Sequence, residues 1–184
     1  MKTTQRAVLV SLLGLSLATG AAVLKTDAAK SSVSATFKQM NVPVEAKFKK
    51  HNIVIDYNAA TPDASKATVD IETASMDLGD ADMNKEVAKK EWFNSAQFPK
   101  ASFTSTAIKS AGAGKLTVSG KLTIKGKVAD VSFPLTVKTE GKTQVFDGAL
   151  PIKRLAFNIG EGEWKDTGMV ADDVTIKFHV VAAQ

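Results

Sequence analysis

The stretch LTVSGKLTIKGKVADVSFPLTV, residues 116–137, alternates apolar and polar side chains with one interruption near Gly126. A period of two residues is typical of β-strands that bury one face and expose the other to solvent. The interruption at Gly126 predicts a turn between two such strands. Pro134 in the second strand indicates a sheet edge or a bulge, because proline has no N–H to donate to a neighbouring strand.

The same alternation recurs along most of the chain and is bounded by turn residues. The clear strand candidates are residues 33–37, 42–48, 53–57, 67–71, 101–109 and 174–180, and shorter candidates are 144–150 and 155–159. Residues 80–91 differ, because Met83 and Val87 fall at helical spacing and Asp80 or Asp82 can cap a helix there. The pattern therefore predicts an all-β domain, a single antiparallel barrel of about eight strands with one short helix over its rim.

The first 22 residues have the pattern of a secretory signal peptide. Lys2 and Arg6 precede an apolar run, and small residues follow it at 19–22. The run is shorter than the roughly 20 residues that a membrane-spanning helix needs. We therefore expect a signal peptide at 1–22, with cleavage near Gly20, Ala22 or Ala28, and a mature domain at 23–184 in the periplasm. An uncleaved N-terminal anchor is the alternative.

The composition limits the classes of function. The chain has no cysteine, which excludes thiol catalysis, lipoprotein anchoring and cysteine-ligated metals. Its formal net charge is +5, and +3 without residues 1–22, which carry two basic and no acidic residues. Scattered lysines on a solvated surface explain this excess, and attraction to anionic head groups, with a transient contact at a membrane surface, is the alternative. No basic and aromatic platform for nucleic acid is present.

The sequence contains no recognisable catalytic set. His51 and His179 are the only histidines, and the alternation predicts that His179 faces solvent. The acidic residues of 77–82 lack the glutamate that closes a calcium loop, so helix capping and turns explain them. No nucleophile elbow, phosphate loop or zinc signature occurs. We expect a protein that is not an enzyme and that needs neither a metal nor a cofactor.

Aromatic residues gather around Pro99. Trp92, Phe93, Phe98 and Phe103 lie within a short segment there, and other phenylalanines project from the predicted strands. Such a cluster can plug one end of a barrel. The alternative is a mouth lined for an apolar ligand.

Four segments of the chain resemble motifs of the YceI-like family, in the order that the family has them. They are VEAKF at 44–48, EWFNSAQFPKASF at 91–103, GKLTIKG at 120–126, and RLAFNIG at 154–160 with Val170, Asp172 and Val174 after it. The chain departs from the family pattern at Ala46, His51 and Asn94. The ordered set spans nearly all of the predicted mature domain, and this order makes the resemblance specific.

The resemblance implies a lipocalin-like antiparallel barrel with an apolar interior, exported to the periplasm. Some proteins that the chain resembles bind long polyisoprenoids, such as isoprenoid quinones or polyprenyl phosphates. By resemblance and by their apolar character, the expected ligand-binding residues are Phe37, Phe48, Trp92, Phe93, Phe98, Phe103 and Phe157. Arg154 is expected to pair with a ligand head group or, equally, with a carboxylate of a loop.

Three hypotheses follow. The first is a carrier that sequesters an apolar lipid, stabilised by burial of hydrocarbon at about 0.8 kcal/mol per CH₂ group. The second is a structural or interaction protein whose barrel is filled by side chains and holds no ligand. The third and weakest is an enzyme acting on a lipid. The volume of the interior separates the first hypothesis from the second.

Overall fold

The hairpin of residues 116–137 lies in the middle of one long sheet. In the computed structural model, which describes residues 22–183, strand β8 spans Lys115–Ile124 and β9 spans Lys127–Glu140. The turn between them is formed by Lys125 and Gly126, with φ of 47° and 73°. Positive φ at both central residues is the geometry of a type I′ turn, whose twist matches that of the flanking strands.

The remaining strands follow the predicted alternation closely. They are β1 (Ala22–Thr26), β2 (Ser32–Gln39), β3 (Val42–Phe48), β4 (His51–Tyr57), β5 (Lys66–Glu72), β6 (Met76–Asp77), β7 (Lys100–Ser110), β10 (Thr143–Lys153) and β11 (Val170–Ala183). Short 3₁₀ turns occur at η1 (Pro62–Ala64), η2 (Thr73–Ser75), η3 (Arg154–Phe157) and η4 (Gly162–Lys165).

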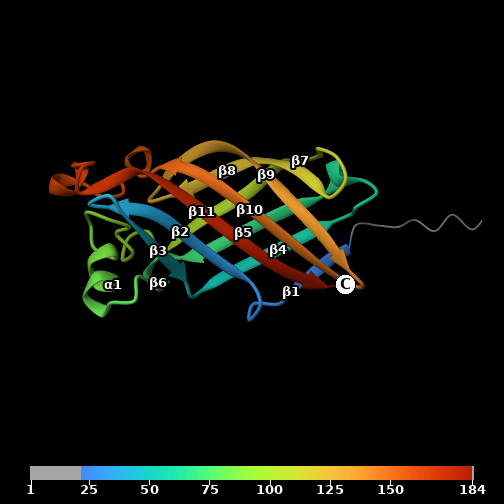
Figure 1. Ribbon diagram of the computed structural model, residues 1–184, viewed down its shortest axis with the longest axis horizontal. Helices are drawn as coiled ribbons and strands as arrows, with labels where there is room; N and C mark the ends of the chain where they lie inside the picture. The colour runs from blue at the N-terminus through green and yellow to red at the C-terminus, as the bar shows by residue number, and fades with distance from the viewer. Residues whose placement is uncertain (1–21, 184) are drawn as a thin grey trace, which may run out of the picture.

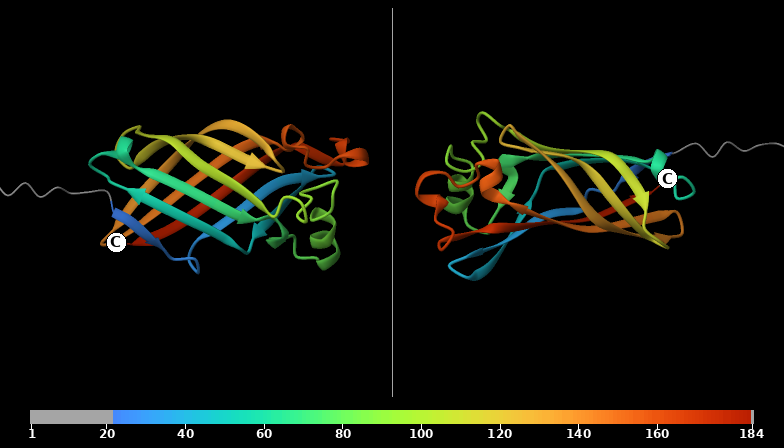
Figure 2. Two further views of the ribbon diagram at one scale, coloured as in Figure 1. Left: turned by 180° about the vertical axis from the view of Figure 1, so that it is seen from behind. Right: turned by 90° about the horizontal axis from the view of Figure 1, so that it is seen from above.

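Eight of these strands close into an antiparallel barrel within the described residues. The pairing runs β1-β4-β5-β7-β8-β9-β10-β11, and β11 pairs with β1 through Lys25↔Ala183 and Thr26↔Ala182 to complete the ring. The other part of the β11 edge pairs with β2, and β3 and β6 extend the sheet from there. Figures 1 and 2 show an elongated barrel with α1 at one end and the C-terminus at the other. The predicted fold class is confirmed.

One helix covers the end of the barrel, but it is shorter than predicted. Helix α1 spans Ala81–Val87, and the Asp80 carboxylate accepts hydrogen bonds from the N–H groups of Asp82 and Met83. The helix ends before residue 91 because the chain folds back there. The N–H of Phe93 bonds to the Val87 carbonyl, and this turn brings Trp92 and Phe93 into the interior.

Two further local predictions are resolved by the structure. The strand predicted at 155–159 is wrong: η3 begins there, and Asn158 after it has a left-handed backbone with φ of 57°. Pro134 lies where the pairing of β9 with β10 stops, since the last pair is Gly148↔Leu135. Of the edge position or bulge predicted for this proline, the structure has a local edge: Pro134 pairs with Thr117 of β8 and has no partner on β10, although β9 is an inner strand of the barrel.

The first residues of the chain are not part of this description. Residues 1–21, which contain nearly all of the predicted signal peptide at 1–22, lie outside the described residues. Between residues 22 and 183, no helix is long and apolar enough to cross a membrane.

Candidate ligand-binding cavity

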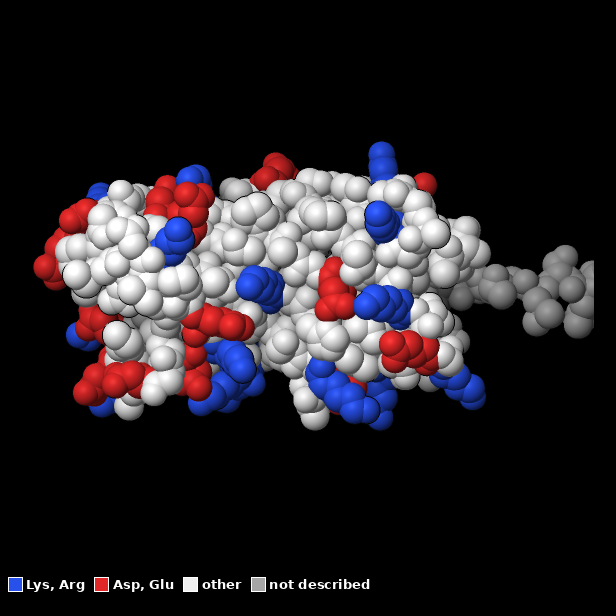
Figure 3. All heavy atoms as spheres, in the orientation of Figure 1, with Lys and Arg blue, Asp and Glu red and all other residues white. Residues whose placement is uncertain are grey.

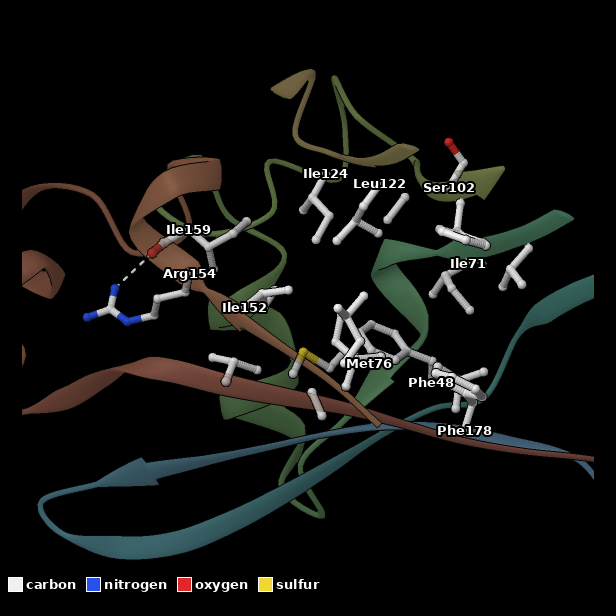
Figure 4. Close-up of a pocket in the computed structure, with 18 of the residues that line it drawn as sticks. Phe48, Ile71, Met76, Ser102, Leu122, Ile124, Ile152, Arg154, Ile159 and Phe178 are labelled. Carbon is white, nitrogen blue, oxygen red and sulfur yellow. Dashed lines mark hydrogen bonds between the residues drawn. The ribbon is translucent and has the colours of Figure 1, made fainter. Parts of the chain in front are cut away.

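The inward faces of the strands enclose an apolar cavity of about 280 Å³. Its wall is built from the apolar members of the sequence alternation. On β8, for example, Leu116, Val118, Leu122 and Ile124 point inward and are buried, whereas Thr117 between them is exposed. Figure 4 shows side chains from several strands converging on this space. A cavity of this volume with an apolar lining lies near the lower end of the range for ligand sites.

Three phenylalanines form an aromatic row inside the barrel. The ring of Phe133 on β9 lies 5.6 Å from that of Phe103 on β7 and 5.2 Å from that of Phe178 on β11. Two strand glycines make room for the outer rings. A methyl group on Gly120 would lie 2.5 Å from the Phe103 ring, and one on Gly148 would lie 2.3 Å from the Phe178 ring. Because these positions have no side chain, the rings of Phe103 and Phe178 can lie against the barrel wall and leave the cavity open.

The end of the cavity that is remote from α1 is closed by aromatic packing. Tyr57 on β4 meets Phe146 on β10 edge to face, with 5.4 Å between the ring centres. Burial raises the pKa of the Tyr57 phenol above its usual value. A phenol is neutral near pH 7 even at its usual pKa, so the hydroxyl can donate a hydrogen bond.

The opposite end is covered by two segments, residues 77–94 with α1 and residues 154–173 with η3 and η4, which we call the cap. The cavity reaches the surface between the cap and β2, at Gln39, Met83 and Glu86, which we call the mouth. Met83 is 44% exposed although it lines the cavity. The mouth is thus the place where a ligand can enter without opening the barrel wall.

Asp77 attaches α1 to the barrel. Its carboxylate accepts hydrogen bonds from Lys49 Nζ at 2.7 Å, Asn84 Nδ2 at 2.9 Å and the Gly79 N–H at 3.2 Å. Lys49 lies just after β3, and Asn84 lies in α1. These donors, Lys49 first, lower the pKa of the Asp77 carboxyl to about 2.

Arg154 organises the cap from inside. Its side chain is 2% exposed, and Figure 4 shows the guanidinium pointing away from the cavity side chains toward the loop of Ile159. It donates to five main-chain carbonyl oxygens, those of Ala171, Ile159, Gly160, Trp164 and Val170. A guanidinium has five N–H donors, so none is left for a ligand or a carboxylate. Burial lowers the pKa of this group below its usual value.

Gly160 is adapted to that arrangement. Its φ is +81°, and a methyl group at this position would collide with the Arg154 guanidinium. Its N–H bonds to the Glu91 carbonyl, which joins the two segments of the cap. Only glycine provides both the backbone conformation and the space.

Lys125, in the turn between β8 and β9, is a second buried cation that contacts the cap, and sequence reasoning missed it. Its ammonium group donates to the carbonyls of Lys90 and Asn158 and to Glu161 Oε2, at 2.7, 2.8 and 2.8 Å. The same contact lowers the pKa of the Glu161 carboxyl. The sequence marks this lysine only by its place in the turn of GKLTIKG, and its partners lie 33–36 positions away.

The structure places six of the eight predicted ligand-binding residues in the wall of the cavity. They are Phe37, Phe48, Trp92, Phe93, Phe103 and Arg154. Trp92 lies against Trp164, with 5.3 Å between the ring centres, so both tryptophans of the chain line the cavity near the cap. The loop residue Trp164 and the mouth residues were not among the predicted set.

Phe98 and Phe157 do not line the cavity. Phe98 is half-buried and packs over Gly126, where a methyl group would lie 3.0 Å from its ring. Phe157 is buried in η3 but does not face the cavity. The hydrogen-bond partners of Arg154 are carbonyl oxygens, and the loop carboxylate expected beside it, Asp172, acts on the guanidinium through its charge and not through a hydrogen bond. The buried Arg154 therefore holds the cap loops together.

No group of acidic or histidine side chains in residues 22–183 could hold a metal ion. His179 faces outward as predicted, and its Nδ1 lies 2.7 Å from a carboxylate oxygen of Asp147 on the surface of the barrel.

Comparison with known families agrees with this geometry. The model of the YceI-like domain matches residues 24–182, which is nearly the whole of the described chain. The chain belongs to the YceI-like family. A relative from the same comparisons, a UPF0312 protein of Pseudomonas fluorescens, is 37% identical over 99 residues, 54% of this chain and 52% of that protein. The chain thus spans about half the length of the curated relatives it matches.

Two solved structures share the fold of this chain. BcnA of Burkholderia cenocepacia is 53% identical with a TM-score of 0.85, covering 86% of this chain and all of that one. A polyisoprenoid binding domain from Saccharophagus degradans, implicated in plant cell wall breakdown, is 16% identical with a TM-score of 0.67, covering 89% of this chain and 98% of that one. The second likeness concerns the fold alone.

Proposed function

We propose that this protein is an exported carrier that holds a long apolar lipid, a polyisoprenoid, inside its barrel, and that it is not an enzyme. The observation that carries the proposal is the apolar cavity of about 280 Å³. The free energy of transferring a hydrocarbon chain from water to such a cavity is favourable by about 25 cal/mol per Å² of apolar surface buried. A chain of isoprene units presents apolar surface along its whole length, as the cavity does.

Two further observations support this proposal. The polyisoprenoid binding domain of Saccharophagus degradans has the same fold, and its ligand class fits a cavity of this lining. A filled barrel without a ligand would have side chains in place of the cavity, so the cavity favours the carrier over that alternative. Export is supported by the basic, apolar and small residues that follow one another in residues 1–22.

We also propose that the protein contacts a membrane when it takes up or releases its lipid. Exposed apolar residues stand around the mouth: Met40 and Val42 at the β2–β3 turn, Met169 at the start of β11, and Met83 on α1. The N–H of Met40 bonds to the Met169 carbonyl, so these two segments adjoin. Because Met83 also lines the cavity, the patch continues into it. We propose that this patch, the rim, touches a bilayer surface while lipid is transferred.

The first test is to purify the mature protein from its own periplasm and to analyse it by native mass spectrometry with lipid extraction. A stoichiometric isoprenoid lipid is the expected result. The binding of that lipid is then measured for Val118→Phe, which fills the cavity, and for the matched control Thr117→Phe on the outer face. We expect at least fivefold weaker binding for the first variant only. Empty protein that refuses added isoprenoids would contradict the carrier.

A further inference from the structure

The pairing between β9 and β10 covers only part of the length of these strands. The last pair is Gly148↔Leu135, and from there toward the cap β9 pairs only with β8, and β10 pairs only with β11. Residues 127–134 of β9 and 149–153 of β10 therefore have no strand beside their facing edges among residues 22–183. We call this unpaired boundary in the barrel wall the seam.

A proline on each strand accounts for the seam. If the register of Gly148↔Leu135 continued, Pro134 would lie opposite Ala149, and Pro151 would lie opposite Ser132. Proline has no N–H to donate and is disfavoured inside a sheet, so the pairing of the two strands ends there. The same prolines discourage another chain from pairing with these edges. The sequence thus keeps the seam free of strands.

The seam borders the cavity. Phe133 on β9 and both Leu150 and Ile152 on β10 line the cavity from the two sides of the seam. In the continued register, Phe133 faces Leu150 and Val131 faces Ile152. Phe133 and Leu150 are buried, whereas Val131 and Ile152, which lie closer to the cap, are only partly buried. At the seam, side chains close the wall in place of backbone hydrogen bonds, and they cover it less completely toward the cap.

A groove lies over the seam on the outer surface of the barrel. Its volume is about 570 Å³, and it contains the point where the two strands part, since its lining includes Pro134, Thr136, Gly148 and Ala149. The cavity lies on the inner side of the same wall, where Leu135 and the ring of Phe178 approach Gly148. The groove and the cavity thus meet the wall from opposite sides at the start of the seam.

The surface beside the seam carries little charge. The outward residues next to it are Ser132 and Pro134 on β9, and Ala149 and Pro151 on β10. The ionisable residues of the groove lie farther away, at Asp147 and on β11. Figure 3, in the orientation of Figure 1, shows a largely uncharged surface over β9 and β10, whereas acidic side chains gather around the end that carries the cap. An apolar chain can therefore approach the seam without removing a charge from water.

Passage through the wall requires less at the seam than between paired strands. Strands β8 and β9, for comparison, pair without interruption from Lys115↔Thr136 to Ile124↔Lys127. Parting such strands would leave N–H and C=O groups without partners, which is unfavourable in an apolar surrounding. At the seam no strand pairing has to break, and only side chains such as Ile152 have to move.

We infer that the seam is a second entrance to the cavity, through which an apolar chain moves sideways between β9 and β10. A long chain that enters at the mouth has to thread the barrel end first, whereas the seam admits it along its side. The inference rests on the carrier function proposed above. It concerns the route of loading, which is separate from the identity of the lipid.

Amide hydrogen exchange tests the seam without any ligand. The amides of residues 145–148 lie between β9 and β11, whereas those of residues 149, 150, 152 and 153 have a strand on one side only. Because alternate residues of an antiparallel strand bond to opposite neighbours, about half of the second group should exchange at least about a hundredfold faster than the first group. Equal protection along β10 would show that the wall is closed and would overturn the inference.

A cross-link across the seam tests the route itself. The chain has no cysteine, so Ser132→Cys with Pro151→Cys places one thiol on each side of the seam. A short bis-methanethiosulfonate reagent joins the two thiols, and reduction removes it. Farnesol is the probe, and the fluorescence of Trp92 and Trp164, which line the cavity, reports its binding. We expect the linked protein to take up and release farnesol at least about fivefold more slowly than the reduced protein, with an affinity within about twofold, because the cavity is unchanged.

The matched control joins the same two strands where they are paired. Lys138→Cys and Val145→Cys form a facing pair there, and linking them should leave both rates within about 1.5-fold of the reduced protein. A link across the mouth, between Gln39→Cys and Met83→Cys, should leave at least about a fifth of the rate of exchange, because the seam stays open.

The outcomes separate the route of loading from the carrier function. If the link across the seam changes neither rate, the seam is not an entrance, and the carrier function stands. If the link across the mouth alone stops exchange, the mouth is the whole route and the inference is overturned. If the unlinked protein binds neither farnesol nor a longer polyprenol, the carrier function fails, and the inference fails with it.

Discussion

The guanidinium carbon of Arg154 lies 5.7 Å from the centre of the Trp92 ring. Trp92 lines the cavity, and Arg154 holds the two cap segments through main-chain carbonyls, so this contact joins the ligand-facing wall to the loops that cover it. A cation over the face of an indole ring is attracted by the ring quadrupole. The position of the tryptophan therefore depends on a residue whose hydrogen-bond donors are all engaged by main-chain carbonyls.

Replacing Arg154 by lysine should destabilise the fold although it keeps the charge. A lysine has three donors for the five carbonyl oxygens, so at least two buried acceptors lose their partner, at about 1–3 kcal/mol each. We expect Arg154→Lys to lower the free energy of unfolding in urea by about 2–6 kcal/mol. The control Lys153→Gln, whose exposed lysine pairs with Asp173, should change it by less than about 0.5 kcal/mol. Equal effects of the two would contradict the structural role of the arginine.

Replacement by alanine should have different effects at Gly120 and Gly148, the two strand glycines that contact the aromatic row. In Gly120→Ala the new methyl group would lie 2.4 Å from the backbone carbonyl of Thr104, which cannot withdraw, so we expect a loss of stability of about 2–3 kcal/mol. In Gly148→Ala the closest neighbour is the Phe178 ring, which can tilt into the cavity. This variant should lose about 1 kcal/mol of stability but bind ligand several times more weakly. Thermal unfolding and ligand titration of both variants test the difference, and unchanged affinity in Gly148→Ala would contradict it.

The attachment of α1 should weaken in acid. The pKa of Asp77 is about 2 in the folded protein and near 3.9 in an unfolded chain, because Lys49 and Asn84 bind its carboxylate only in the fold. Its contribution to stability is therefore complete above about pH 5, decreases as the pH falls through 4 toward 2, and is absent below 2. Urea unfolding of the wild type and of Asp77→Asn between pH 2 and 6 measures it. The difference between the two proteins should shrink as the pH falls, and a constant difference would contradict the assignment.

The barrel could be predicted because the alternation within each strand shows which side chains face inward. Each inward residue of β8 alternates with an outward one, so Val118 and Thr117 could be assigned to opposite faces without knowledge of any other strand. The aromatic cluster could likewise be placed near one end of the barrel. Whether Trp92 lined the interior or plugged it depended on the loop of Trp164, which is 72 positions away and carries no periodic pattern.

The predicted site residues that lie elsewhere, or have other partners, than expected share a different cause. Phe98, Phe157 and Arg154 lie in segments without regular alternation, so their direction is set by turns and by distant carbonyl groups. The five acceptors of Arg154 come from residues 159–171, and no property of the arginine in sequence distinguishes them from a phosphate or a carboxylate. The acidic residues of the two cap segments are visible in the sequence. That they gather at one end of the barrel follows only from the structure, which brings the two segments together.

If the exposed rim contacts the membrane, changes to the rim should alter the rate of lipid transfer to vesicles without altering the affinity for lipid in solution. Met40 is 74% exposed and Val42 is 62% exposed at the β2–β3 turn, next to the mouth. The double change Met40→Asn and Val42→Ser should slow transfer of a bound isoprenoid to phosphatidylcholine vesicles at least fivefold, because it removes apolar surface that enters the interface. Its affinity for the same lipid in solution should stay within about twofold of the wild type.

A valine away from the rim provides the control for this prediction. Val54 on β4 is 40% exposed on the side of the barrel, and Val54→Ser should leave the rate of transfer unchanged. The two cap segments contain ten acidic and five basic residues, a net charge of −5, so replacing part of the phosphatidylcholine by an anionic lipid should not speed transfer. Equal rates for the rim variant and the wild type would place the contact with the bilayer elsewhere. Faster transfer to anionic vesicles would instead assign the contact to a part of the chain outside the cap, since the positive charge lies there.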